Sequence, residues 1–293
     1  MVASLTTAAP ATPGRGVGEA LWLTMGGGLD NRNGYALVGE DRATVEVKGP
    51  DATEYLQGLI TNHMPRISDK GGRVMFDAFI YNQTTGREDP RYLIEVNQRV
   101  KDKLMMMLRF YKLRSRVHIR DATEEYGVWN IWGEMGGKED RVGWKAWQQD
   151  SRAPNMGIRA LLEKGSKPRF ESSEFVEAAS DKYKLRRILE GVAEGPDDFV
   201  PDVALPLECN LDYMGGVDFN KGCYVGQELT IRSHHRGVVR KRMVPVIMSG
   251  ERHAGVDLVD LDAKLGVRPQ MEVIWNPGPA TTSDQGEERR RRK

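Results

Sequence analysis

The sequence contains only two cysteines, Cys209 and Cys223, among its 293 residues. Two thiols cannot build the multi-bridge framework that stabilises small secreted proteins, and no Cys-x-x-Cys spacing typical of a metal site occurs. Because the chain also has only five histidines, we do not expect it to form a metal site by itself. The composition predicts free thiols in a reducing compartment.

The chain also lacks an apolar run of the roughly 20 residues needed to cross a bilayer. It has no surplus of one charge, since 43 Lys and Arg stand against 42 Asp and Glu, for a net charge of +1. A protein dedicated to nucleic-acid binding normally carries a basic surplus, so any recognition of an anion must be local. The GxSxG, Walker A, Rossmann and HExxH patterns are absent as well.

Apolar material is plentiful enough for a sizeable core, because hydrophobic residues make up 39% of the chain. The length suits two or three compact units. The first 20 residues are rich in Ala, Ser, Thr, Gly and Pro, with Arg15 as the one basic residue, and fit either a transit peptide or a plain disordered terminus. Residues 276–293 end in five basic residues and predict a solvated tail.

Residues 43–122 alternate between strand and helix periodicities in a regular order. Strands are predicted at Ala43–Lys48, Arg73–Tyr81, Tyr92–Val96 and Ser115–Ile119, and helices from Asp51 to about His63 and at Gln98–Lys112. The two middle strands are expected to form a hairpin. The resulting order, β-α-β-β-α-β, is that of a ferredoxin-like unit.

A second α+β region is expected to follow. Tyr126–Trp132 predicts a strand, a helix is expected from Ser172 or Ser173 to about Glu190, and Val238–Met248 predicts another strand. Between them, residues 191–226 are rich in Gly, Pro and Asp. Long segments of this kind often carry function.

Cys223 lies between Gly222 and Gly226, which let the backbone approach a ligand closely. Lys221 precedes it, and a basic group that includes Arg232 and Arg236 follows within 13 residues. If these cations fold over the thiol, its pKa falls and a thiolate becomes available as nucleophile or metal ligand. The alternative is a small buried hydrophobic residue. Cys209 lies in an apolar setting, which favours a structural role.

Three other features could carry chemistry. The five cations of Arg232–Arg242 could grip an anion such as a phosphate or polyglutamate, or form a solvated strand edge. His234 and His235 are adjacent, so in a strand they would point to opposite faces and would not readily bind one ligand. Asp77 interrupts an apolar strand and faces either solvent, the simpler account, or a cleft in which desolvation raises its pKa.

The segment Lys221–Glu228 (KGCYVGQE), continued by Arg232–Arg242, carries a resemblance to a known family. Further motifs support it at Gly49–Ala52 (GPDA), Leu56–Asn62 (LQGLITN) and Gly72–Asp77 (GRVMFD), so that the match covers roughly residues 35–248. On these motifs the chain resembles the YgfZ/Iba family of iron–sulfur cluster assembly factors, in the glycine-cleavage T-protein-like superfamily. Asn210–Asn220 is similar to the mitochondrial branch of that family.

The resemblance implies an α+β, T-protein (GcvT)-like fold with interleaved subdomains, one of them ferredoxin-like, around a folate-type pocket. It also implies a small C-terminal β-barrel, which looks incomplete here because only about 28 residues separate Met248 from the tail. The expected organisation is a flexible N-terminus (1–30), an N-terminal unit with the ferredoxin-like part (31–122), a second unit with the signature (123–240), a truncated β domain (241–276) and a disordered basic tail (277–293).

As function, the resemblance implies a non-catalytic assembly factor of the mitochondrial matrix, which works with A-type (Isa-type) scaffold proteins to mature four-iron four-sulfur proteins. Cys223 would share the metal with partner ligands, so that a cluster is held only in the complex. The residues shaping its loop would be Lys221, Gly222, Tyr224, Gly226, Gln227 and Glu228. Asp77, Arg232 and Arg236 would belong to an anion or folate pocket for tetrahydrofolate.

Two other functions stay open from the sequence. The first is a folate-dependent one-carbon (aminomethyl) transferase, in which Asp77 would be the acid–base carboxylate; its chemistry leaves the cysteine signature unexplained. The second is a folate-binding regulator that never contacts a cluster. Cluster reconstitution with partner proteins and a one-carbon transfer assay separate these functions from the assembly factor.

Overall fold

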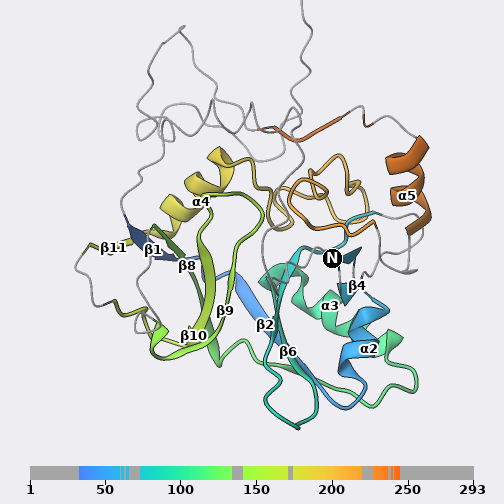
Figure 1. Ribbon diagram of the computed structural model, residues 1–293, viewed down its shortest axis with the longest axis horizontal. Helices are drawn as coiled ribbons and strands as arrows, with labels where there is room; N and C mark the ends of the chain where they lie inside the picture. Colours follow the sequence, from blue (N-terminus) through green and yellow to red (C-terminus); the bar gives the residue numbers. More distant parts are fainter. Residues whose placement is uncertain are drawn as a thin grey trace, which may run out of the picture.

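The computed structural model describes residues 33–59, 61–62, 64–65, 73–133, 141–170, 174–219, 227–236, 239 and 241–244. Within them the chain forms a four-stranded sheet, a five-stranded sheet and a two-stranded ribbon, β3 (Thr61–Asn62) with β4 (Met64–Pro65) (Figure 1). None of the described helices is long and apolar enough to span a membrane.

The four-stranded sheet and its helices form the ferredoxin-like unit. Its strands are β2 (Arg42–Lys48), β5 (Ala78–Asn82), β6 (Arg91–Asn97) and β7 (His118–Asp121), and its helices are α2 (Ala52–Gln57) and α3 (Gln98–Tyr111). The strand order is β5-β6-β2-β7, with every neighbouring pair antiparallel. The β-α-β-β-α-β order predicted from the sequence is therefore confirmed.

Helix α3 packs on this sheet through the apolar stripe that its sequence predicts. Val100, Leu104, Met107 and Leu108 are buried against the sheet, and Tyr111 is half-buried. The helix begins where the Asn97 side chain accepts a hydrogen bond of 3.0 Å from the backbone N–H of Arg99. A polar N-cap of this kind satisfies a donor that the helix itself leaves unpaired.

The five-stranded sheet is built from one strand before the ferredoxin-like unit and four strands after it. It contains β1 (Gly34–Leu37), β8 (Tyr126–Trp132), β9 (Trp144–Gln149), β10 (Ile158–Glu163) and β11 (Val176–Ala178), in the order β11-β1-β8-β10-β9. Only β1 and β11 pair in parallel. Because β1 precedes the ferredoxin-like unit in sequence, the two sheets are interleaved, as expected. Helix α4 (Ser180–Leu189) contacts β1 (Figure 1).

The two sheets share one apolar core. Phe79, Tyr81 and Leu93 from the four-stranded sheet lie in the same buried cluster as Val128 and Leu161 from the five-stranded sheet. The ferredoxin-like sheet therefore has its helices on one face and the second sheet on the other. This arrangement encloses the space in which the polar residues described below lie.

Three predicted strands differ from the observed ones. Residues 73–77 do not extend β5, because the backbone of Val74 bonds instead to Ala204 and Asp202, at 2.8 and 3.0 Å. Strand β7 begins at His118, three residues later than predicted. The predicted strand at 238–248 is described only at 239 and 241–244, which are not in a strand.

The helix predicted from Ser172 or Ser173 begins only at Ser180. Before it, Val176–Ala178 pair in parallel with Gly34–Ala36 as β11, and Ala179 is the extended residue that precedes the helix. Tertiary pairing with β1 thus overrides the helical periodicity of this segment. The helix ends at Leu189, close to the predicted end.

The last described helix is α5 (Gln227–Arg236), which lies at the right of Figure 1. A solvated strand edge was one of the two alternatives for residues 232–242, and for residues 232–236 the helix contradicts it. The truncated barrel (241–276), apart from residues 241–244, and both predicted disordered termini lie outside the described residues.

Candidate functional site

The signature loop is covered by the described residues only at its end. Lys221, Gly222, Cys223, Tyr224 and Gly226 lie outside them, so their predicted roles remain predictions. Gln227 and Glu228 are the first two residues of α5, described for their backbone alone. Cys223 therefore precedes a ten-residue helix by four positions in the sequence.

The second cysteine is enclosed in the apolar core. Cys209 is 4% exposed and belongs to the cluster shared by the two sheets. Burial raises the pKa of its thiol to about 12, with the nearby Glu208 charge adding to the shift. A buried thiol with a raised pKa is mostly protonated at neutral pH, which disfavours it as a metal ligand or nucleophile. The predicted structural role of Cys209 is confirmed.

Helix α5 presents exposed polar side chains. Arg232, His234 and His235 are exposed, and the His234 ring stacks on Phe219 with centroids 3.7 Å apart. The two histidines do not lie on opposite faces of a strand, as the sequence suggested, but on a helix, with their rings edge to face at 5.0 Å. The side chain of Arg236 lies outside the described residues.

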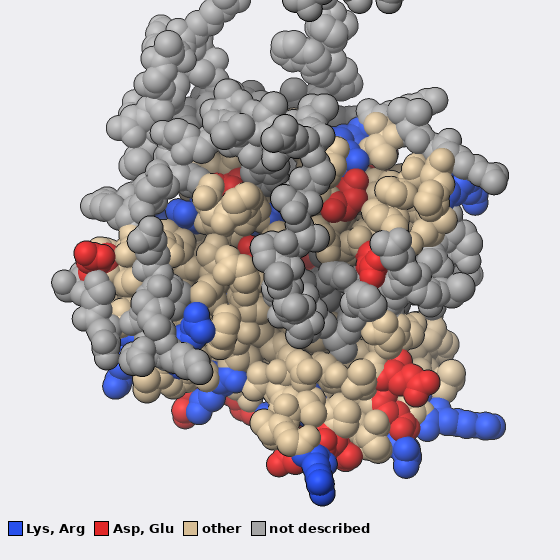
Figure 2. Space-filling model, in the orientation of Figure 1, with Lys and Arg blue, Asp and Glu red and all other residues tan. Residues whose placement is uncertain are grey.

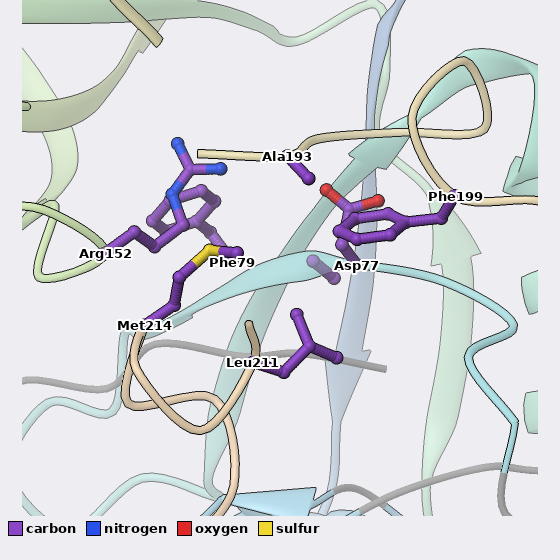
Figure 3. Close-up of a pocket in the computed structure, with 8 residues that line it drawn as sticks. Asp77, Phe79, Arg152, Ala193, Phe199, Leu211 and Met214 are labelled. Carbon is purple, nitrogen blue, oxygen red and sulfur yellow. The ribbon is translucent and has the colours of Figure 1, made fainter. Parts of the chain in front are cut away.

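Asp77 lines a pocket at the edge of the shared core. The other lining residues come from β5 and from two later loops: Ala78, Phe79, Arg152, Ala193, Phe199, Leu211 and Met214. Figure 3 shows the Asp77 carboxylate beside the Phe199 ring and the Arg152 side chain beside Phe79. Asp77 is 8% exposed, so the simpler account, a carboxylate facing solvent, was wrong.

The surroundings of Asp77 favour its neutral form. Burial raises the pKa of the carboxyl, and the Glu194 charge adds to this, whereas Arg42, Arg152 and the Gly195 N–H act in the opposite direction. The Gly195 N–H donates to Asp77 Oδ1 at 3.0 Å. A buried carboxyl with a raised pKa can donate as well as accept a hydrogen bond, as acid–base groups in clefts do.

Arg152 is the cation of this pocket, and it is rigidly held. Its guanidinium donates to both carboxylate oxygens of Asp150, at 2.8 and 2.7 Å, and to Glu194 at 2.7 Å. It also donates to the Tyr183 hydroxyl at 3.1 Å and stacks over the Phe79 ring at 4.6 Å. A guanidinium fixed on several sides loses little entropy when it binds a ligand.

Behind Arg152, a buried ion network joins the two sheets. Arg159 of β10 is fully buried and donates at 2.7 Å to Glu95 of β6, which also accepts from Arg42 at 2.8 Å. Glu194 lies 3.3 Å from Arg159 and 3.7 Å from Arg42. Because of these arginines, the pKa values of Glu95 and Glu194 are lowered despite burial.

The charges of the network balance without Asp77. Four arginines face four carboxylates: Arg42, Arg152, Arg159 and Arg187, with Glu95, Asp150, Glu194 and Asp198. Asp77 is a fifth carboxylate in the same low-dielectric region. This surplus explains why burial dominates the pKa of Asp77 but not that of Glu95 or Glu194.

This network and Arg152 were not predicted from the sequence. The residues predicted to form one anion or folate pocket were Asp77, Arg232 and Arg236, but Arg232 is not among the residues that line the pocket. A signal was present in the strands, since Glu95 and Arg159 each stand alone within an apolar run (YLIEV and IRALL). Opposite charges isolated in two buried strands predict an internal ion pair, because neither can be buried unpaired.

Elsewhere on the described surface, charges of both signs are mixed. Figure 2 shows blue and red side chains interspersed along the lower part of the visible face. Among the described residues, no group of three or more His, Cys, Asp or Glu side chains is placed to hold a metal ion. The chemistry that the described residues support is therefore that of a small pocket with one buried acid and one fixed guanidinium.

The described residues define an α+β protein with a ferredoxin-like unit, an interleaved second sheet and a polar pocket in their shared core. No family model matches the chain. Curated relatives do, and several are named "Iron-sulfur cluster assembly factor IBA57 homolog, mitochondrial". The relative from Aspergillus clavatus is 35% identical over a match that covers 87% of this chain. The relative from Neosartorya fischeri is 37% identical over 73% of this chain, and the one from Mycosarcoma maydis is 39% identical over 70% of it.

These matches show that the chain is a homologue of the mitochondrial IBA57 proteins, and the resemblance to the YgfZ/Iba family is confirmed. The chain spans 65% of the length of the Aspergillus clavatus relative, 57% of the Neosartorya fischeri one and 55% of the Mycosarcoma maydis one. The glycine cleavage system aminomethyltransferase T from Bartonella henselae superposes with a TM-score of 0.49 at 12% identity, over 74% of this chain and 67% of that one. We draw no conclusion from that structural likeness.

Proposed function

We propose that the protein is an iron–sulfur cluster assembly factor of the mitochondrial matrix. The observation that carries the proposal is the identity of 34–39% to curated proteins of that name, over 70–87% of this chain. The cluster is cargo in this function, received from and passed to other proteins. The chain's own contribution is to complete a ligand set and to bind the partner.

Cys223 is the thiol proposed for that task. Cys209 is buried with a pKa raised to about 12, which leaves Cys223 as the candidate thiolate of this chain. One thiolate cannot hold a cluster, because iron–sulfur clusters take several protein ligands. The partner therefore supplies the remaining ligands, and Lys221, Gly222, Tyr224, Gly226, Gln227 and Glu228 shape the loop that presents Cys223.

The partner proposed for the ligand set is a scaffold protein of the A-type (Isa-type), and the product is a four-iron four-sulfur cluster for delivery to other proteins. Two features support a shared site. The chain has too few thiols to build a cluster site alone, and the described residues include no cluster of metal-binding side chains.

A folate-type ligand is proposed for the Asp77 pocket. Asp77 and Arg152 offer a proton donor or acceptor and a fixed cation, between the apolar side chains of Phe79, Phe199 and Met214. These groups have the hydrogen-bonding and apolar character that a flat, nitrogen-rich ring such as that of tetrahydrofolate requires. The cavity volume beside Asp77 is about 10 Å³, room for about one water and far below the roughly 300–1,000 Å³ of most ligand pockets, so the lining side chains must move apart before a ring can bind. When bound, the folate would supply one-carbon chemistry.

The decisive experiment is cluster reconstitution with the full chain and a purified A-type partner. We expect partner-dependent absorbance of a bound cluster with the native protein, and its loss with Cys223→Ser, since serine removes the proposed ligand. Cys209→Ala is the matched control, because it removes the other thiol at a buried site. It should retain cluster formation.

Three results would contradict the proposal. Cluster absorbance that is unchanged by Cys223→Ser would show that the thiol is not a ligand. Robust one-carbon transfer from tetrahydrofolate that survives Cys223→Ser, without any partner-dependent cluster, would instead identify a folate-dependent transferase with Asp77 as its acid–base group. A protein that binds tetrahydrofolate but shows neither activity would be a folate-binding regulator.

A further inference from the structure

Helix α3 exposes an apolar stripe on the side opposite its buried one. Met106, Phe110 and Leu113 are 63%, 72% and 86% exposed. Their spacing of i, i+4 and i+7 places them in one row along the helix and its C-terminal end. Single exposed apolar residues are ordinary on a protein surface, but three consecutive members of one row form a continuous strip that marks an interaction site.

The backbone at the end of this strip is strained. Leu113 has φ of 46°, in the left-handed region that favours glycine, two positions after the last residue of α3. A leucine there has a steric cost that glycine would avoid. Since its side chain is almost fully exposed, packing within the described protein does not offset that cost. Strain of this kind, held at an exposed apolar residue, points to a functional contact.

Basic side chains border the strip at its C-terminal end. Arg109, Lys112 and Arg114 form no ion pair with any described residue, although most other cations near α3 do, such as Lys101 with Asp121 and Lys103 with Asp202. At the other end of the strip lies Asp102, beside a shallow hollow between α3 and β7 that includes Met106 and Arg109. The strip is therefore apolar along its length and positive where it ends.

We propose that Met106, Phe110 and Leu113, with Arg109, Lys112 and Arg114 at their border, form a docking surface for an acidic amphipathic helix of a partner protein. The apolar face of that helix covers the strip, and its carboxylates pair with the three free cations. Helices bound in this way present apolar anchors at i, i+3, i+4 and i+7. Aromatic and arginine side chains dominate the affinity of such surfaces. This surface lies on the ferredoxin-like unit, and it goes beyond the proposed cluster function.

The test uses the full chain and a fluorescein-labelled synthetic peptide with leucines at i, i+3, i+4 and i+7 and glutamates on the opposite face. Fluorescence anisotropy should show saturable binding. The double variant Phe110→Ser/Leu113→Ser should weaken it by about tenfold or more, because it removes the anchors. Arg109→Glu/Arg114→Glu should also weaken binding and reduce its salt dependence, because charge attraction is lost.

Matched controls come from exposed sites far from α3. Val176→Ser, an exposed apolar residue of β11, and Arg87→Glu, an exposed cation between β5 and β6, should leave peptide binding unchanged. Circular dichroism verifies that each variant is folded.

Three results would overturn the proposal. The first is no binding of the peptide, or binding that both double variants leave unchanged. The second is flotation with phosphatidylserine vesicles that depends on Phe110 and Leu113 while the peptide does not bind, which would identify a lipid surface. The third is self-association of the chain through the same residues, measured by sedimentation, if added peptide does not reduce it.

Discussion

Beside the pocket, Asp77 shares a low-dielectric region with a network in which every other charge already has its partner. The Gly195 N–H is the donor that the structure assigns to its carboxyl. Arg42 and Arg152 favour its ionised form, but burial outweighs them, so the folded-state pKa lies above the ordinary value for an aspartate. The surroundings of this carboxyl are thus tuned toward its neutral form, and ionising it costs the folded state free energy.

This tuning predicts a pH-dependent effect of Asp77→Asn. A carboxyl whose pKa is raised on folding lowers the stability of the folded state as the pH rises from the unfolded pKa to the folded pKa. Each pH unit between these two pKa values lowers the free energy of unfolding by about 1.4 kcal/mol. Asparagine removes this cost and can still accept the Gly195 bond. The variant should therefore be more stable than the native protein at pH 7, measured by urea unfolding.

The difference between the two proteins should shrink as the pH falls through about 4, the ordinary pKa of an aspartate, and vanish below about pH 3, where the aspartate is protonated in both states. Asp198→Asn serves as the control, since that carboxylate pairs with Arg187 and its loss should destabilise the protein. A loss of stability in Asp77→Asn at pH 7 would mean that the carboxylate is ionised and paired.

Two residues of the pocket, Asp77 and Arg152, show how much of the site the sequence predicts. Asp77 was identified because a carboxylate stood in an apolar strand, and the pocket confirms its cleft alternative. Arg152 could not be found in this way, because it lies in a turn after β9 and looks like any surface arginine. Its burial depends on Asp150 and Glu194, and that pairing exists only in three dimensions.

At the scale of elements, local periodicity predicted the correct order of the ferredoxin-like unit, since each of its helices and strands has its own apolar repeat in the sequence. It was wrong for β11, and it did not predict α5. Val176–Ala178 form a strand because Gly34–Ala36 lie beside them, a pairing between distant segments. Residues 232–236 form a helix although their charges fitted a strand edge equally well. Patterns within a segment do not record which distant segment it meets.

Connections between elements depend on particular glycines, and Gly157 gives a clear test. It precedes β10 with φ of 74°, and a Cβ added there would lie 2.1 Å from the carbonyl oxygen of Ile131 on β8. Gly157→Ala should therefore destabilise the protein by about 3 kcal/mol, since both the backbone conformation and the β8–β10 contact are disturbed. Thermal and urea unfolding measure the effect.

Gly165 is the matched control for that substitution. Its φ is 82°, but nothing lies within 4 Å of an added Cβ. Gly165→Ala should cost about 1 kcal/mol, the penalty of the left-handed conformation alone. Equal effects of the two substitutions would show that β8 and β10 separate easily and that the close approach is unimportant.

At the scale of the molecule, the buried ion network links the two sheets, whose relative position the apolar core alone would define less sharply. Glu95 lies on one sheet and Arg159 on the other, and Glu194 reaches arginines of both. Hydrophobic packing is tolerant of small shifts, whereas charged pairs of this kind have few satisfactory positions. We infer that the network fixes how the two sheets sit around the pocket.

Glu194→Gln tests the network. Its pKa is lowered well below the ordinary value by Arg159, Arg152 and Arg42, despite burial. Removing the charge leaves those arginines buried with fewer partners, so we expect a loss of about 3–5 kcal/mol at pH 7. Because the folded-state pKa is depressed, the native protein has this stability above the unfolded pKa and loses it as the pH falls through the folded pKa.

The control for this variant is Asp197→Asn, at a carboxylate three positions after Glu194 in the sequence. Asp197 pairs with Arg99 at an exposed site, where loss of the pair should change stability by less than about 1 kcal/mol. Urea unfolding at pH 7 compares the two. Similar small effects for both would mean that the network contributes little to the stability of the molecule.

The position of β1 has a consequence for the order of events during synthesis. Gly34–Leu37 leave the ribosome before the ferredoxin-like unit, yet their partners Trp129–Trp132 and Val176–Ala178 are made only after that unit is complete. Until then β1 has two unpaired edges and must wait for strands that do not yet exist. A nascent chain can therefore finish its first sheet early, but it cannot close its second one until translation has passed Ala178.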